Sequence, residues 1–310
     1  MSSNIGFNRW IPHAEFSMPY SAYNSYNGEL RQMYRTMLSS HSYVYTSLKE
    51  DHGANWEDSP SLFFKFDAEV KKTNAFFNDL KEWSKAYNKL QNWNNLNTLL
   101  AICANFETYL VGIIKLSLES DVGVLYGMPQ ELDGIKVIKL GKKFDFTAEI
   151  VSCTKGEWAS RISHLKQYFG EVPTILETNI SQLDTMRRTR NDVAHSFGRN
   201  INAAQEIHKL QKLDSISMSN QQVLKYWNLV DDCVREIDHQ FFRKHVGEYQ
   251  LLYFYYLNEL AIESRLSPSQ LNVSNKARLF RKLYGKAEKN GVTTLPQKFC
   301  VGLVEYYDSI

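Results

Sequence analysis

"WNNLNTLLAICANFETYLVGII", residues 93–114, carries the apolar stripe that decides the fold class. Its repeating positions alternate in steps of three and four, the spacing that puts side chains on one face of an α-helix. The stripe consists of Trp93, Leu96, Leu100, Cys103, Glu107, Leu110 and Ile114. Six of these seven residues are apolar and one is a carboxylate. The stretch therefore predicts a core-facing helix with one charge, Glu107, on its apolar face.

Helical spacing recurs on both sides of this stretch. Before it lie two further stripes: Leu30, Met33, Met37, Val44 and Leu48, then, after Pro60, Phe66, Val70, Phe77, Leu80 and Tyr87. After it we expect a helix over 155–169 and another that begins at Thr174. A further helix should run from about residue 247 to Ser264, and the basic tail 276–291 should also be helical. The most regular, heptad-like stripe is Val223, Trp227, Val230, Val234, Ile237 and Phe241. The chain is predicted to be all-α, a helical bundle.

Residues 119–156 interrupt this pattern. They hold five of the fifteen glycines, and "GIKVIKLGKKFDFTAEIV", residues 134–151, alternates β-branched and aromatic residues between turn residues. Such alternation is typical of short strands. We expect a small Gly-rich loop or hairpin inserted between helices.

Composition excludes several classes of protein. With 310 residues and 43% apolar content, the chain is long enough for a substantial core. Its net charge of +2 does not by itself mark a nucleic-acid binder. The first residues do not resemble a signal peptide and the apolar runs are short, which favours a cytoplasmic protein that does not span a membrane. The four cysteines form no CxxC pair, so we expect no metal site and no cofactor.

"RRTRNDVAHSFGR", residues 187–199, holds four arginines and one aspartate. On a straight helix from Thr174, Arg187 and Arg190 fall on the apolar face, whose other members are Leu176, Ile180, Leu183, Met186, Ala194 and Phe197. A buried arginine needs an anion or a path to solvent. We therefore expect a polar pocket in which Glu107 holds Arg187 or Arg190. The alternative is a plain ion pair that fixes helix register.

His195 completes this candidate site. It follows Asn191 by one helical turn and Asp192 by three residues, so either side chain could orient the imidazole. Arg190 lies five residues before it. Long side chains at a helix end could converge on one phosphate, with the arginine donating paired hydrogen bonds and the histidine moving a proton.

The run from Arg190 to His195 resembles the R-polar-x-x-x-His motif of HEPN domains, helical bundles found in many RNases. "NFETYL", which contains Glu107, is similar to the first core helix of such domains. The resemblance covers about residues 90–250 and implies a HEPN-type bundle with 119–156 as an insertion. It divides the chain into a helical extension over 1–90, a HEPN-like domain over 91–250, and a C-terminal helical tail or subdomain over 251–310.

The same resemblance implies a metal-independent endoribonuclease in which the RNA 2'-hydroxyl attacks the adjacent phosphate. Arg190 and His195 would be catalytic, and Asn191, Asp192, Glu107 and Arg187 would support them or bind RNA. Two motifs would meet across a homodimer interface. The setting would be a toxin or an antiviral defence effector, restrained by a partner such as an antitoxin or a sensor protein. A noncatalytic helical interaction or sensor module, with a structural Arg/His motif, is the second reading.

Overall fold

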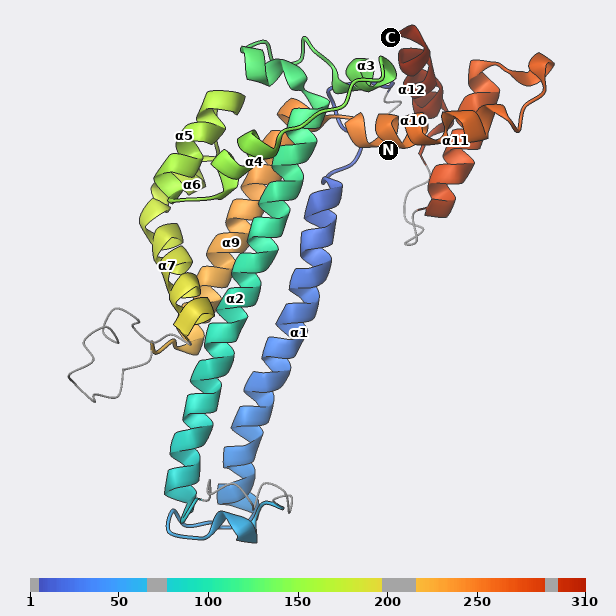
Figure 1. Cartoon of the computed structure of the whole chain (residues 1–310). Coiled ribbons are helices and arrows are strands. Elements are labelled where there is room, and N and C mark those ends of the chain that lie inside the picture. The colour runs from blue at the N-terminus through green and yellow to red at the C-terminus, as the bar shows by residue number, and fades with distance from the viewer. Residues whose placement is uncertain (1–5, 66–76, 197–215, 288–294) are drawn as a thin grey trace. The chain divides into compact units, whose positions relative to one another are not determined.

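The computed structural model describes residues 6–65, 77–196, 216–287 and 295–310. In these residues every regular element is helical and no strand forms, so the predicted all-α class is confirmed (Figure 1). The helices are α1 (Met18–Thr46), α2 (Leu80–Ser120), α3 (Gly134–Lys139), α4 (Thr147–Thr154), α5 (Trp158–Phe169), α6 (Thr174–Thr178), α7 (Ile180–Ser196), α9 (Asn220–Phe241), α10 (Tyr249–Glu263), α11 (Val273–Ala287) and α12 (Gln297–Ser309).

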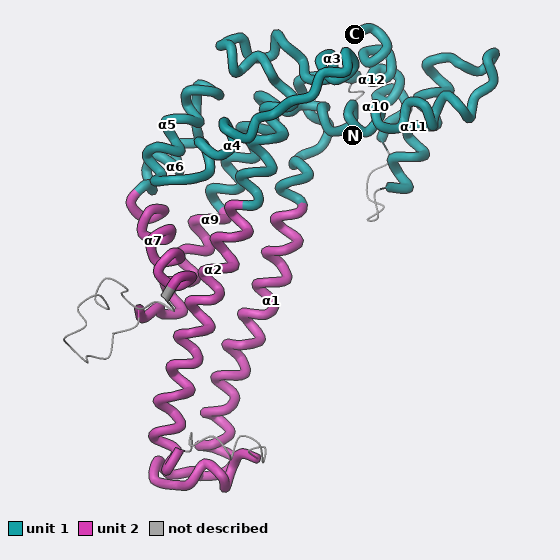
Figure 2. Tube along the Cα trace, viewed as in Figure 1, with its two compact units in different colours: residues 1–21, 108–180, 232–310 teal, residues 22–107, 181–231 magenta. Residues whose placement is uncertain are grey.

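The chain divides into two units, each assembled from separate segments (Figure 2). Unit 1 consists of Met1–Ser21, Thr108–Ile180 and Asp232–Ile310, and unit 2 of Ala22–Glu107 and Ser181–Asp231. The boundaries fall within α1, α2, α7 and α9, so these helices contribute to both units. The division into three consecutive parts, 1–90, 91–250 and 251–310, stays a prediction.

The core of unit 2 is organised around Trp227 on α9. Its indole N–H donates to the Asn27 side-chain oxygen at 2.5 Å, and its ring lies 5.7 Å from that of Tyr34. The Tyr34 hydroxyl in turn donates to Asn95 at 3.1 Å. All six residues of the predicted α9 stripe are buried, three in each unit, which confirms that stripe.

Helix α2 is one continuous helix where the sequence shows two stripes. It begins at Leu80, so Leu80 and Tyr87 are helical, whereas Phe77 precedes the helix and residues 66 and 70 lie outside the described residues. By length and composition alone, α2 is apolar enough to cross a membrane. Buried core helices of water-soluble proteins pass the same test, and Leu99, Ile102 and other α2 residues are buried.

The insertion over 119–156 contains short helices, and the alternative of a hairpin is wrong. In place of a strand ladder, one isolated antiparallel bridge joins Asp121 to Asp133. The Asp133 side chain accepts a hydrogen bond from the Ile135 backbone N–H at 3.0 Å and so caps the start of α3. Gly134 is required there, because a Cβ would lie 1.6 Å from the carbonyl oxygen of Glu119. The cap directs the β-branched residues that follow into a helix.

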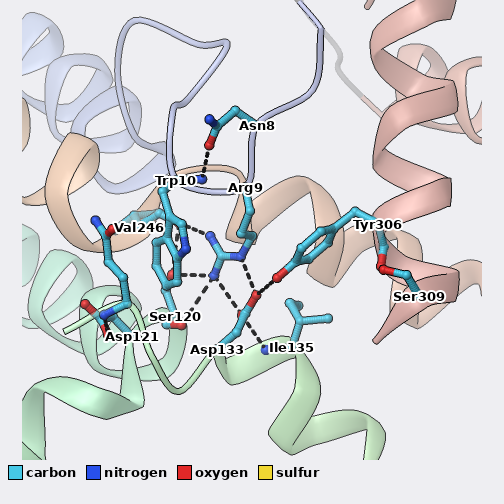
Figure 3. A network of polar contacts seen from close by, with 11 residues as sticks. Asn8, Arg9, Trp10, Ser120, Asp121, Asp133, Ile135, Val246, Tyr306 and Ser309 are labelled. Carbon is cyan, nitrogen blue, oxygen red and sulfur yellow. Dashed lines mark hydrogen bonds and ion pairs between the residues drawn. The ribbon is translucent and has the colours of Figure 1, made fainter. Parts of the chain in front are cut away.

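The segment before α1 is fastened to the rest of unit 1 by Arg9 (Figure 3). Its guanidinium donates to both carboxylate oxygens of Asp133, to the Ser120 hydroxyl at 2.9 Å and to the Val246 carbonyl at 2.8 Å. The Tyr306 hydroxyl donates to the same carboxylate. Arg9 and Asp133 are both buried. The network therefore ties four distant segments of the chain together.

The C-terminal helices of unit 1 pack around aromatic side chains. The ring of Tyr255 on α10 lies 5.6 Å from Phe280 on α11 and 4.8 Å from Tyr307 on α12. All three residues are fully buried. The expected helix up to Ser264 is confirmed as α10, and the basic tail is helical as far as residue 287, where the described stretch ends.

Candidate functional site

The helix expected to run straight from Thr174 is broken. Its first part, α6, ends at Thr178, and α7 begins at Ile180. Between them Asn179 takes φ −116° and ψ 18°, and its side-chain amide donates to the carbonyl of Ile175 at 2.9 Å. A side chain that bonds back to the preceding turn competes with the helical ladder, which accounts for the break.

The buried face of α7 contains Val193 in place of the predicted Ala194. Leu183, Met186 and Val193 are buried, and Arg190 occupies the remaining position of their three-four-three spacing. Ala194, which was expected on this face, is exposed, and residue 197 lies outside the described residues. Leu183, Met186 and Arg190 keep the predicted register, and the difference is confined to the end of α7, where Val193 and not Ala194 is buried.

Arg190 is held by two oxygen acceptors within unit 2. Its Nη2 donates to Oε2 of Glu107 on α2 at 3.3 Å, and its Nη1 donates to Oδ1 of Asn191 at 3.0 Å. The side chains of Arg190 and Glu107 are 32% and 24% exposed, so the pair is only partly screened by water. The contact expected between Glu107 and an arginine of α7 is present, and the arginine is Arg190.

Arg187 has a partner that the sequence reasoning missed. Its Nε donates to Oδ1 of Asp184 at 2.9 Å, three residues earlier on the same helix. The signal was visible, because oppositely charged residues three apart on a helix are neighbours. Arg187 and Arg190 thus bind different carboxylates at this edge of α7.

His195 lies in the last turn of α7, and its side chain is exposed. Asp192 is also exposed, whereas Asn191 is partly buried. The helix therefore presents a fixed guanidinium at its buried edge and an imidazole to solvent within the next turn and a half. Guanidinium groups bind phosphate oxygens in pairs, and an imidazole exchanges protons near neutral pH. A phosphodiester is a substrate that could use both groups.

Tyr226 of α9 lies near Cys103, on the same face of α2 as Glu107. Burial raises the pKa of the Tyr226 hydroxyl, and the neighbouring Cys103 thiol raises it further. Cys103 lies four residues before Glu107, which is one turn along the same face. Tyr226 therefore stays protonated at neutral pH, as a hydrogen-bond donor close to the Glu107 face. The sequence reasoning missed it, because the heptad-like stripe passes beside it.

Other clusters of charged side chains differ from this one in burial and in composition. Within the described parts of the chain, no three His, Cys, Asp or Glu side chains lie close enough together to hold a metal ion. In unit 1, Nδ1 of His245 lies 2.9 Å from Oδ2 of Asp121, and the Gln130 backbone N–H donates to the other carboxylate oxygen at 2.7 Å. Both members of that pair are buried. It joins elements of the core and presents no reactive group to solvent.

Comparison of the chain with protein-family models, with curated proteins and with solved structures found no match. The resemblance to HEPN domains therefore rests on the motif and the residues around it alone.

Proposed function

We propose that the chain is an endoribonuclease that cleaves RNA with Arg190 and His195. The observation that carries this proposal is the arrangement of Arg190, whose guanidinium is bound by Glu107 and Asn191 on a helix that exposes His195 in its last turn. The resemblance of Arg190 to His195 to the HEPN motif supports the same conclusion.

The reaction is an internal transfer of the phosphate. A base takes the proton of the 2'-hydroxyl, the 2'-oxygen bonds to the adjacent phosphorus, and the bond from phosphorus to the 5'-oxygen breaks. An acid gives a proton to the departing 5'-oxygen, which leaves a 2',3'-cyclic phosphate and a 5'-hydroxyl. Arg190 would bind the nonbridging oxygens, where negative charge grows in the transition state. His195 would carry the proton, and no metal is required.

The one histidine that each copy of the motif supplies does not readily serve as both base and acid. We propose a homodimer in which the motifs of two copies surround one phosphate, so that each copy supplies one His195. Asn191 would orient Arg190, Asp192 and Arg187 would border the RNA, and Glu107 would position the guanidinium. A cytoplasmic toxin or antiviral effector restrained by an antitoxin or sensor protein is the setting that this resemblance suggests.

A noncatalytic interaction module is the second candidate. The observation that favours it is the same ion pair, because Arg190 already has a carboxylate partner within its own chain. A pair of this kind can fix the register of two helices without any substrate. If the chain is a nuclease, removing Arg190 or His195 lowers the rate of RNA cleavage. If it is an interaction module, the same change affects only the contact between helices or with a partner.

The deciding experiment compares the wild-type protein with Arg190→Ala and His195→Ala on total cellular RNA, with and without a metal chelator. We expect each substitution to lower the cleavage rate by about 10²–10⁴-fold. Chelation should leave wild-type cleavage unchanged. Loss of wild-type cleavage on chelation would instead show a metal-dependent reaction.

Two exposed residues supply the matched controls. Arg188→Ala removes a neighbouring arginine of α7, and His239→Ala removes an exposed histidine from the last turn of α9. Both variants should cleave RNA like the wild type. Equal cleavage by all five folded proteins would contradict the proposed roles of Arg190 and His195. If the protein sediments as a monomer at the concentration at which it cleaves RNA, the composite site is contradicted.

A further inference from the structure

Helix α11 has an unusual balance of charge. Its fifteen residues, Val273–Ala287, include five basic side chains and no acidic one. One of the five is neutralised inside unit 1, because Nζ of Lys276 lies 2.8 Å from Glu263 and 3.6 Å from Asp308. The remaining four, Arg278, Arg281, Lys282 and Lys286, leave the helix strongly positive although the whole chain is nearly neutral.

Three of these four side chains lie on the outer face of α11. Arg278, Lys282 and Lys286 are exposed and follow one another in steps of four residues, about 6 Å along the helix axis per step. Arg281 is only partly exposed, with its Nε buried, and is not part of this row. The opposite face carries Ala277 and Phe280, which are fully buried against the other C-terminal helices. The outer face is therefore a row of cations on a helix whose inner face is anchored in the core.

The chemistry of this face fits a polyphosphate backbone better than a membrane surface. A helix that binds membranes inserts an exposed apolar face between lipids. In α11 the large apolar side chains are buried or partly buried, and its exposed residues are polar or small. Repeated cations without an apolar face bind phosphates by charge, without reading a sequence.

We propose that Arg278, Lys282 and Lys286 on α11 form a binding surface for the RNA backbone, separate from Arg190 and His195. The choice of RNA among polyanions rests on the proposed function. The surface adds affinity for any RNA, and it contributes a salt-dependent term because phosphate binding releases counterions.

The test measures binding of a fluorescein-labelled single-stranded RNA by anisotropy over a series of salt concentrations. Every protein is the full chain with His195→Ala, so that cleavage does not interfere. Neutralisation of the face by Arg278→Gln, Lys282→Gln and Lys286→Gln together should lower the affinity at least about tenfold at low salt. The slope of log affinity against log salt should fall in magnitude by about 2, since each lost phosphate contact removes about 0.7 for single strands.

Helix α2 offers a control with the same spacing and the same change of charge. Lys81, Lys85 and Lys89 are exposed in steps of four residues, but Asp79 and Glu82 lie beside them. Their joint replacement by Gln should leave the affinity and the slope close to those of the parent protein. Equal losses in the two triple variants would overturn the proposal, because the effect would then follow net charge alone.

Three further outcomes separate this proposal from its alternatives. Binding of the parent protein to phosphatidylserine vesicles but not to RNA, abolished by the α11 triple variant, would assign the face to a membrane and overturn the proposal. If the wild-type protein cleaves no RNA while the α11 triple variant still loses RNA affinity, the proposed nuclease fails and the RNA surface stands. If the wild-type protein cleaves RNA and the α11 triple variant keeps its RNA affinity, the proposed nuclease stands and the proposed RNA surface on α11 is overturned.

Discussion

Arg9 donates hydrogen bonds to both carboxylate oxygens of Asp133, at 2.8 Å and 3.0 Å, across 124 residues of sequence. The side chains are 3% and 5% exposed, so water cannot replace either partner. A buried charge that loses its counterion stays in a medium of low polarity, and this cost exceeds the net stabilisation by the intact pair.

Arg9→Met should therefore lower the free energy of unfolding by about 3–5 kcal/mol, measured by chemical denaturation. Arg31→Met is the matched control, because Arg31 also pairs with an aspartate, Asp231, but both side chains are about one-third exposed. Loss of this partly exposed ion pair should lower the free energy of unfolding by about 1 kcal/mol or less. Arg9→Lys, which keeps the charge without the forked geometry, should lie between the two. Equal losses in the Arg9→Met and Arg31→Met variants would contradict this account.

Gly247 lies against the same N-terminal segment. Its φ is +52°, and a Cβ there would lie 2.3 Å from the carbonyl oxygen of Arg9. Gly247→Ala should lower the free energy of unfolding by at least about 2 kcal/mol, because both the backbone conformation and the close approach oppose a side chain. Gly28→Ala in α1, where a Cβ meets open space, should stabilise the protein by up to about 1 kcal/mol. Thermal unfolding of the two variants should therefore shift in opposite directions.

The pairing of Glu107 with Arg190 can be measured by a double-mutant cycle. Glu107→Ala, Arg190→Ala and the double variant should give a coupling energy of about 0.2–1 kcal/mol in chemical denaturation, since the pair is partly exposed. The coupling should fall at high salt. The control cycle on Asp232 and Arg235, whose side chains are 45% and 56% exposed, should give a smaller coupling. A coupling near zero for Glu107 and Arg190 would remove the positioning role proposed for Glu107.

Glu248 predicts a pH dependence of stability. Burial raises the pKa of its carboxyl from 4.5 to about 7, although Arg9 and the His13 backbone N–H both favour the charged form. The folded state then keeps a proton that the unfolded chain releases between those two values. Stability contributed by the neutral carboxyl is fully present below pH about 4.5 and is lost as the pH rises through about 7.

Glu248→Gln should remove this loss, because the amide stays neutral and still offers an oxygen to His13. Above pH 7 the variant should exceed the wild type in free energy of unfolding by about 3 kcal/mol at most. Glu131→Gln, an exposed carboxyl of the same unit, should keep the wild-type slope of stability against pH. A Glu248→Gln protein with the wild-type slope would show that another group controls the dependence.

The helices that sequence predicts best are those whose signal is local and repeated. The α9 stripe repeats one apolar face over five turns, so a single error of spacing could not hide it. The contact of Glu107 with Arg190 was predictable for a related reason. Each residue places a charge on the apolar stripe of its own helix, and two such charges of opposite sign stabilise one another.

The failures have a common physical cause, which is a contact that overrides the local preference. Val137 and Ile138 favour strands by residue type, yet the Asp133 cap places them in a helix. The break at Asn179 was missed because it depends on a side-chain hydrogen bond that no periodicity reveals. Arg9 gave no signal at all, since each of its hydrogen-bond partners lies more than 100 residues away.

The anchorage of residue 9 also governs when unit 1 is completed in the cell. The segment is synthesised early, but the network around Arg9 also includes Val246 and Tyr306. Tyr306 is synthesised almost 300 residues later. At usual speeds of translation the delay is roughly 15–60 s. During that time the segment lacks part of its binding site, and chaperones have access to it. The network around Arg9 therefore cannot close until these later segments are made, and a circular permutation that shortens the wait would let the N-terminal segment dock sooner after its synthesis.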